Sequence, residues 1–146
     1  MLAMAAASLA LGVGINFIAR EPLPLLKALP KAGSDMPAIG EVDADFVLQA
    51  GNAPGTLLLD ARAAAAYRAG HIPGALSLPL ADFASEFAAL APRLQAAALL
   101  VLYCSDRNCG DSTELARRLW AKGLKNLLLY RGGMEDWSGR GHAVEK

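Results

Sequence analysis

The sequence contains little cysteine and no excess of charge of either sign. Two of its 146 residues are cysteines, Cys104 and Cys109, which excludes the disulfide-rich scaffold of a small secreted domain. The 14 basic residues balance the 14 acidic residues, and the two kinds are mixed along the chain. Because no basic stripe is present, we do not expect nucleic acid as a partner. A bridge between the two cysteines would close only a short loop, so chemistry explains these residues better than stability does.

Charged side chains are also absent from the first 19 residues (MLAMAAASLALGVGINFIA). As a helix, residues 1–19 would extend roughly 30 Å, the thickness of the hydrocarbon core of a bilayer. We therefore expect a single-pass membrane anchor. The alternatives are a signal peptide, which normally begins with Lys or Arg, and a helix buried in the protein. Basic residues follow the segment and none precedes it, which leans towards a cytoplasmic domain but leaves the side of the membrane open.

The segment that follows is rich in proline. The stretch at 20–37 holds four prolines and shows no sustained hydrophobic period. Proline removes backbone donors and blocks the continuation of helices, so we predict an extended linker here. One globular domain is then expected over residues 38–146, a length that suffices for a single hydrophobic core.

Within this domain, short apolar runs alternate with amphipathic stretches. The apolar runs predict strands at 56–59, 75–78, 99–103 and 126–130. Helices are predicted at 63–69 and after the capping residues Asp43, Asp82 and Asp111. Strands that are apolar throughout and separated by helices indicate a parallel sheet covered on both faces. The expected fold class is therefore α/β with three layers.

Cys104 is the strongest candidate for a catalytic residue. It follows the apolar run at 99–103 and opens a loop that leads into a helix, and ligands of open parallel sheets bind at the carboxyl ends of the strands. Backbone N–H groups of such a loop and the helix end favour an anion, so we expect a lowered pKa and a thiolate near neutral pH. A thiolate there could take up sulfane sulfur as a persulfide and pass it on, with Arg107 attracting an anionic donor. The alternative is a merely buried cysteine at a strand end.

Four motifs in this domain resemble those of the rhodanese homology domain, and they occur in that family's order. They are Asp60-Ala-Arg62, the run YRAGHIPGA from Tyr67 to Ala75, Tyr103-Cys104, and Gly132-Gly133 followed by Trp137. GHIPGA is the most specific of the four. The resemblance implies a three-layer α/β/α domain with a five-stranded parallel sheet, in which the active cysteine opens the loop after the fourth strand.

The same resemblance implies an activity and a site. The expected activity is that of a sulfurtransferase, in which a Cys104 persulfide moves sulfane sulfur from a small donor to a thiol or other nucleophilic acceptor. Arg62 matches an arginine near the site and is expected to be accessory. Neither a cofactor nor a metal is expected, since two thiols fall short of the four ligands of a metal site. The residues expected to cradle the substrate are Ser105, Asp106, Arg107, Asn108, Cys109 and Gly110.

The cysteine loop departs from the commonest pattern of the family. It is longer, lacks a glycine early in the loop and contains a second cysteine. The sulfur donor is therefore left open, and transfer from thiosulfate to cyanide is not assumed. Related phosphatases of this fold need an arginine six positions after the cysteine to bind an oxyanion, and that position is Gly110 here, which argues against phosphatase activity.

Two further interpretations stay open. Cys109 could attack a persulfide on Cys104, release sulfide and leave a disulfide, so that the pair acts as a thiol–disulfide relay, or it could be a passive loop residue. A different class of function is a non-catalytic module that recruits a partner to the membrane, although the active cysteine is usually replaced in such modules. His71 we interpret as a hydrogen-bonded structural residue that fixes the GHIPGA turn.

Overall fold

The computed structural model describes residues 36–51 and 53–146. The expected membrane anchor at 1–19, and all but the end of the expected linker at 20–37, lie outside the described residues. Among the helices that the structure describes, none combines the length and the apolar character of a membrane span. Contacts group Asp35–Lys146 into one unit.

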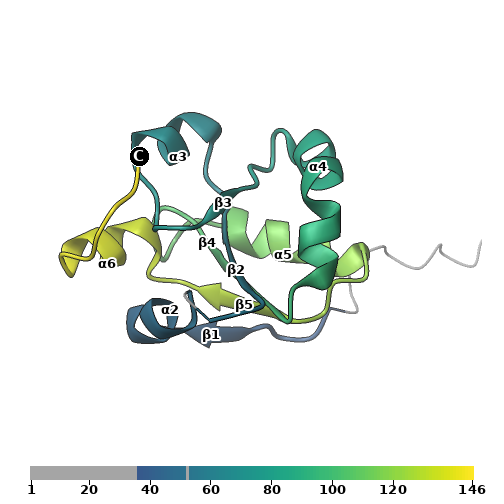
Figure 1. Ribbon diagram of the computed structural model, residues 1–146, viewed down its shortest axis with the longest axis horizontal. Coiled ribbons are helices and arrows are strands. Elements are labelled where there is room, and N and C mark those ends of the chain that lie inside the picture. Colours follow the sequence, from purple (N-terminus) through teal and green to yellow (C-terminus); the bar gives the residue numbers. More distant parts are fainter. Residues whose placement is uncertain (1–35, 52) are drawn as a thin grey trace, which may run out of the picture. The chain divides into compact units, whose positions relative to one another are not determined.

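Five parallel strands form a single sheet, which confirms the five-stranded parallel architecture (Figure 1). In spatial order the strands are β1 (Gly40–Val42), β5 (Leu127–Tyr130), β4 (Leu99–Tyr103), β2 (Thr56–Asp60) and β3 (Leu76–Ser77). The middle strand, β4, pairs with β2 on one side and with β5 on the other. The register sets Tyr103 beside Asp60 and beside Tyr130, so the carboxyl ends of the three central strands lie level.

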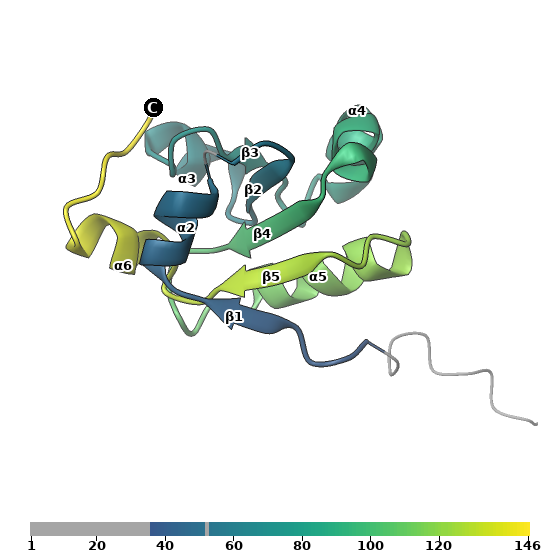
Figure 2. The same ribbon diagram turned by 60° about the horizontal axis from the view of Figure 1, so that its bottom comes forward.

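Helices cover both faces of the sheet, which confirms the three-layer α/β class (Figure 2). One face packs against α4 (Phe83–Ala96) and α5 (Asp111–Ala121), and the other packs against α2 (Ala44–Ala50) and α6 (Gly133–Gly139). The remaining described helix, α3 (Ala64–Ala69), connects β2 with β3 and buries none of its residues.

The alternation of side chains along the strands produces these two cores. Leu59 and Leu102 belong to the core under α4 and α5, whereas their neighbours Leu58 and Val101 belong to the core under α2 and α6. Successive residues of a strand point to opposite faces, so a strand that is apolar throughout is suited to burial on both sides. The apolar strands β2 and β4 therefore lie in the interior of the sheet.

The local sequence pattern predicts neither β1 nor α6. β1 is an edge strand of three residues, two of them exposed, and α6 is a helix of seven residues that begins and ends with glycine. Elements this short carry too few apolar residues to establish a period. Each is held in place by neighbours that come from distant parts of the chain.

Of the three predicted helix caps, one is confirmed. Asp43 Oδ1 accepts the N–H of Phe46 at 2.9 Å at the start of α2. Asp82 precedes α4 but makes no capping bond, because its backbone (φ −107°, ψ 17°) is not extended as that of a capping residue usually is. Asp111 is the first residue of α5 and not its cap, because the backbone is already helical at Gly110.

Candidate active site

Cys104 directly follows the middle strand, at the edge of the sheet where the carboxyl ends of β2, β4 and β5 lie level. This is the edge at which open parallel sheets bind their ligands. The side chain of Cys104 is 2% exposed, and the loop that it opens runs to Gly110 and into α5. The expected place of the cysteine is therefore the observed one.

The first turn of α6 holds the start of this loop. The carbonyl of Cys104 accepts the N–H of Met134 at 3.0 Å, and the carbonyl of Ser105 accepts the N–H of Glu135 at 2.8 Å. Gly133 permits this close approach, because its φ is +62° and a Cβ there would lie 2.5 Å from the carbonyl oxygen of Cys104. Gly133 thereby fixes the position of the backbone that carries Cys104.

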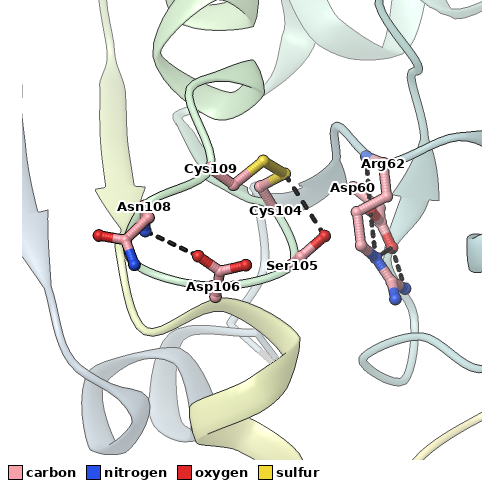
Figure 3. The surroundings of a disulfide bond; sticks show 7 residues. All are labelled: Asp60, Arg62, Cys104, Ser105, Asp106, Asn108 and Cys109. Atoms are coloured by element: carbon pink, nitrogen blue, oxygen red, sulfur yellow. Dashed lines mark hydrogen bonds and ion pairs between the residues drawn. A yellow bond between two sulfur atoms is a disulfide. The ribbon is translucent and has the colours of Figure 1, made fainter.

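The sulfur atoms of Cys104 and Cys109 are joined in a disulfide (Figure 3). The two Cα atoms are 6.1 Å apart, within the usual range for disulfides. From the sequence it is open whether four intervening residues permit this geometry, and the folded loop does bring the sulfurs together. The hydroxyl oxygen of Ser105 also lies by Cys104, at 4.0 Å from its sulfur.

Asp106 shapes the loop between the two cysteines. Its Oδ1 accepts the N–H of Asn108 at 2.8 Å (Figure 3). Its carbonyl accepts the N–H of Cys109 at 3.3 Å. Bonds of this kind from an aspartate to the residues that follow it make a tight turn, and this turn returns Cys109 towards Cys104. Two amides that the sequence assigns to an anion cradle therefore bind Asp106 instead.

The other expected cradle residues lie at the surface. Arg107 lines a pocket together with residues of β1, β5 and α6. The structure thus brings Ser105 and Cys109 to the sulfur of Cys104, and it sets Arg107 against a pocket on the β1 side of the loop. The exposed members of the expected cradle are Ser105, Arg107, Asn108 and Gly110, and the half-buried ones are Asp106 and Cys109.

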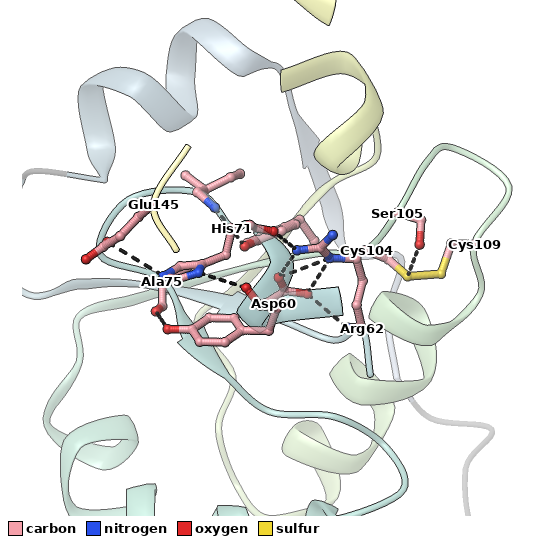
Figure 4. A network of polar contacts seen from close by, with 12 residues as sticks. Asp60, Arg62, His71, Ala75, Cys104, Ser105, Cys109 and Glu145 are labelled. Atoms are coloured by element: carbon pink, nitrogen blue, oxygen red, sulfur yellow. Dashed lines mark hydrogen bonds and ion pairs between the residues drawn. A yellow bond between two sulfur atoms is a disulfide. The ribbon is translucent and has the colours of Figure 1, made fainter. Parts of the chain in front are cut away.

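Arg62, the expected accessory residue, forms a buried ion pair with Asp60 (Figure 4). Its Nε lies 3.0 and 3.1 Å from the two carboxylate oxygens of Asp60, and its Nη2 lies 2.7 Å from one of them. The same Nη2 donates to the carbonyl of Gly70 at 2.7 Å. Since Asp60 is fully buried and the Arg62 side chain is 10% exposed, this pair ties the end of β2 to the GHIPGA turn.

Tyr103 joins β4 to the same turn. Its hydroxyl oxygen accepts the N–H of Ile72 at 3.2 Å, and its side chain is fully buried. Burial, and then the negative charge of Asp60, raise the pKa of Tyr103 well above its usual value. The hydroxyl stays neutral at physiological pH and serves as a hydrogen-bonding link.

His71 has the structural role predicted for it. Its Nδ1 lies 3.0 Å from the carbonyl oxygen of Tyr67, and its ring stacks on the ring of Tyr67 with the centroids 3.7 Å apart. On the other side, Nε2 lies 3.6 Å from the Glu145 carboxylate, and the backbones of His71 and Glu145 form an antiparallel bridge (Figure 4). The C-terminal segment, to which the sequence assigns no role, therefore packs on the GHIPGA turn.

One group in the described part of the chain has the residue types and spacing to hold a metal ion. Cys104, Cys109 and Asp111 each offer a ligand atom within 4.8 Å of the other two. Thiolates bind metals, so binding would need the reduced cysteines, and a tetrahedral zinc ion would need a fourth ligand. Asp111 is a site residue that the sequence motifs do not reveal, although its place at the head of the helix after the loop is a signal that could have found it.

The comparisons with known proteins agree with this geometry. The sequence model of the rhodanese-like domain matches residues 43–140. No curated protein matches the chain. Among solved structures, the BH2092 protein of Bacillus halodurans is 27% identical and has a TM-score of 0.59, over 73% of this chain and 76% of that one.

Two more distant structures show the fold alone. The rhodanese-like domain of Alr3790 from Anabaena sp. is 23% identical with a TM-score of 0.58, over 74% of this chain and 80% of that chain. EanB, solved in complex with hercynine, is 23% identical with a TM-score of 0.64, and the match covers 77% of this chain but 29% of EanB. At family level, the match to the rhodanese-like domain model supports a sulfurtransferase-type or thiol-related function. Because the family's sequence model matches residues 43–140, the chain belongs to the rhodanese-like domain family.

Proposed function

We propose that this domain is a sulfurtransferase that carries sulfane sulfur on Cys104 as a persulfide. The observation that carries the proposal is the position of Cys104, which directly follows the middle strand and opens the loop into α5. α5 is a helix of 11 residues, and the partial positive charge at its N-terminus favours a thiolate over a thiol. The bonds from α6 hold the backbone of Cys104 in place, so the nucleophile is fixed before a donor arrives.

The reaction has two balanced steps. The Cys104 thiolate attacks the sulfane sulfur of a donor, the bond between that sulfur and the rest of the donor breaks, and the rest leaves with the electron pair. An acceptor thiolate then attacks the outer sulfur of the Cys104 persulfide, and the Cys104 thiolate is regenerated as the leaving group. The donor is a small molecule with sulfane sulfur, the acceptor is a thiol, and the chemistry uses no cofactor.

A second candidate function, a thiol–disulfide relay, is favoured by the bond between Cys104 and Cys109. The Cys109 thiolate attacks the inner sulfur of the persulfide, sulfide leaves, and the two cysteines are joined. Cys104 is 2% exposed whereas Cys109 is half-buried, so an external thiol reaches the sulfur of Cys109 more easily. Attack there releases Cys104 as a thiolate, and a second external thiol frees Cys109 from the mixed disulfide.

Intact-mass measurement after incubation with polysulfide or a persulfidated thiol tests both functions. We expect reduced Cys109→Ser to gain sulfur on residue 104, Cys104→Ser to gain none there, and the wild type to release sulfide and accumulate the disulfide. If Cys109→Ser gains no sulfur from any donor, the sulfurtransferase proposal is wrong. If the wild type holds its persulfide as long as Cys109→Ser does, the relay is wrong.

We also propose that residues 1–19 tether the domain to a membrane. The support is their composition, which lacks charge over a length matched to a bilayer core. Membrane fractionation of the full chain, with a variant that lacks residues 1–19 as the control, tests the tether. Protease accessibility in sealed vesicles then gives the side of the membrane. Recovery of the full chain in the soluble fraction would overturn this proposal.

A further inference from the structure

A charged pocket lies beside the cysteine loop, between the loop, the ends of β1 and β5, and α6. Its volume is about 310 Å³, near the lower end of the range of small-molecule sites. The loop reaches the pocket through Arg107, three residues after Cys104. Acidic and basic side chains line it in equal number, namely Glu41, Asp43, Asp136, Arg107, Arg131 and Arg140.

Four of these six side chains already form ion pairs with one another. Arg131 Nε lies 3.0 Å from Glu41 Oε1, and Arg140 Nε lies 2.9 Å from Asp136 Oδ1. The second oxygen of Asp136 accepts the hydroxyl of Tyr130 at 2.8 Å. The hydrogen bonds from Tyr130 and Arg140 lower the pKa of Asp136, so this carboxylate stays charged and paired.

The two remaining charges are Arg107 and Asp43. The guanidinium of Arg107 is exposed, and among the described residues it makes no hydrogen bond or ion pair; its positive charge is one of the smaller causes that lower the pKa of Asp136. One carboxylate oxygen of Asp43 accepts the N–H of Phe46, and the other has no hydrogen-bond partner among the described residues. The pocket therefore offers a ligand one cation and one anion.

We propose that this pocket binds the α-amino acid group of a small thiol that accepts the sulfur from Cys104. The proposal rests on the proposed sulfurtransferase function and names its acceptor. The carboxylate of such a thiol pairs with Arg107 and its ammonium group with Asp43. Its thiolate attacks the outer sulfur of the Cys104 persulfide, so that the acceptor leaves as a persulfide and Cys104 as a thiolate. A zwitterion suits a pocket that has both signs of charge and little room.

Single-turnover transfer from a preloaded persulfide tests this inference. The Cys109→Ser protein is loaded with polysulfide, desalted, and mixed with one of four thiols, and the loss of the persulfide is followed by intact mass. L-cysteine carries both charged groups, 3-mercaptopropionate only the carboxylate, cysteamine only the ammonium group, and 2-mercaptoethanol neither. Because each thiol is compared between variants, differences in thiol reactivity cancel.

Arg107→Gln should slow transfer to L-cysteine and 3-mercaptopropionate about fivefold relative to 2-mercaptoethanol, as for an exposed ion pair. Asp43→Asn should slow transfer to L-cysteine and cysteamine by a similar factor, and Asn preserves the cap of α2. The matched control is Arg68→Gln, an exposed arginine on α3 near the opposite edge of the sheet, which should change none of the four rates.

The outcomes separate this proposal from the one on which it rests. If the persulfide forms but either variant slows all four thiols equally, or none of them, the α-amino acid site is refuted while the sulfurtransferase function stands. If no persulfide forms on Cys104, the sulfurtransferase function itself fails. The inference is also contradicted if the transfer rate in Arg107→Gln depends on the carboxylate of the thiol as strongly as in the parent protein. The same holds if the transfer rate in Asp43→Asn depends as strongly as before on the ammonium group of the thiol.

Discussion

Asp111→Asn removes a negative charge that lies beside the two cysteines. A carboxylate oxygen of Asp111 lies within 4.8 Å of both sulfur atoms, at the head of α5. A neighbouring negative charge favours the neutral thiol over the thiolate. Its effect on the pKa of the thiol is therefore opposite to that of the helix N-terminus, which favours the thiolate. The substitution is therefore expected to lower the pKa of the thiols in the reduced protein.

The size of the effect follows from the distance. Two unit charges 4.8 Å apart interact by about 0.9 kcal/mol at the dielectric constant of water, which suits the exposed Asp111. At low ionic strength this energy lowers the pKa of the thiol by about 0.6 of a pH unit. Below that pKa the thiolate fraction rises roughly fourfold, while the less basic thiolate is about half as nucleophilic. Alkylation should therefore become about twice as fast.

The assay is the pH dependence of iodoacetamide alkylation in a Cys109→Ser background, where Cys104 is the one cysteine left. Added salt should reduce the difference in alkylation rate between the parent protein and Asp111→Asn, because the Asp111 carboxylate is exposed to solvent. The matched control is Asp82→Asn, which changes an aspartate before α4 that caps nothing. A profile that stays in place in Asp111→Asn, or that moves to higher pH, would refute the electrostatic reasoning.

Three further changes test the packing around the site. Arg62→Leu leaves Asp60 buried without its partner, so urea unfolding should show a loss of about 3–5 kcal/mol, and a loss below about 1 kcal/mol would contradict the buried pair. Gly133→Ala puts a Cβ 2.5 Å from the carbonyl oxygen of Cys104 at a left-handed φ. It should lower the free energy of unfolding by at least about 1 kcal/mol and slow persulfide formation. Unchanged stability and rate would count against the anchoring role of α6. Reduction of the disulfide between Cys104 and Cys109 opens a short loop and should lower the free energy of unfolding by no more than about 2 kcal/mol. Thermal melts of the oxidised and reduced protein measure this loss, with a variant lacking both cysteines as the control. A larger loss would identify a structural bridge.

Much of the sheet could be predicted from local pattern. The apolar runs that became β2, β4 and β5 are short and uninterrupted, and strands with this pattern are buried on both faces. Asp43 was predicted as a cap correctly because a cap depends on residues three positions apart. Asp82 takes the N-cap position of α4 but makes no capping bond, and Asp111 lies one residue inside α5. Backbone angles that a one-letter pattern does not encode decide both outcomes.

In the candidate site, too, some features could be predicted from local sequence and others could not. Cys104 could be identified because its place depends on one strand and one helix that are adjacent in sequence. In the Gly132-Gly133 motif, φ is positive at Gly133 only, since Gly132 has a φ of −58°. The bond from the residue after this motif to the carbonyl of Cys104 could not be predicted, because the two segments meet only after β4 and β5 pair.

The sequence by itself therefore determined the α/β class, the parallel sheet and the position of Cys104 at the start of the loop after the middle strand. These depend on the spacing of apolar residues and on neighbours along the chain. Only the tertiary structure decided that Cys109 reaches Cys104, that Arg107 faces a charged pocket, and that Asp111 lies beside the sulfur atoms. Those contacts depend on loop backbone angles and on the packing of β1, β5 and α6, which local pattern does not specify.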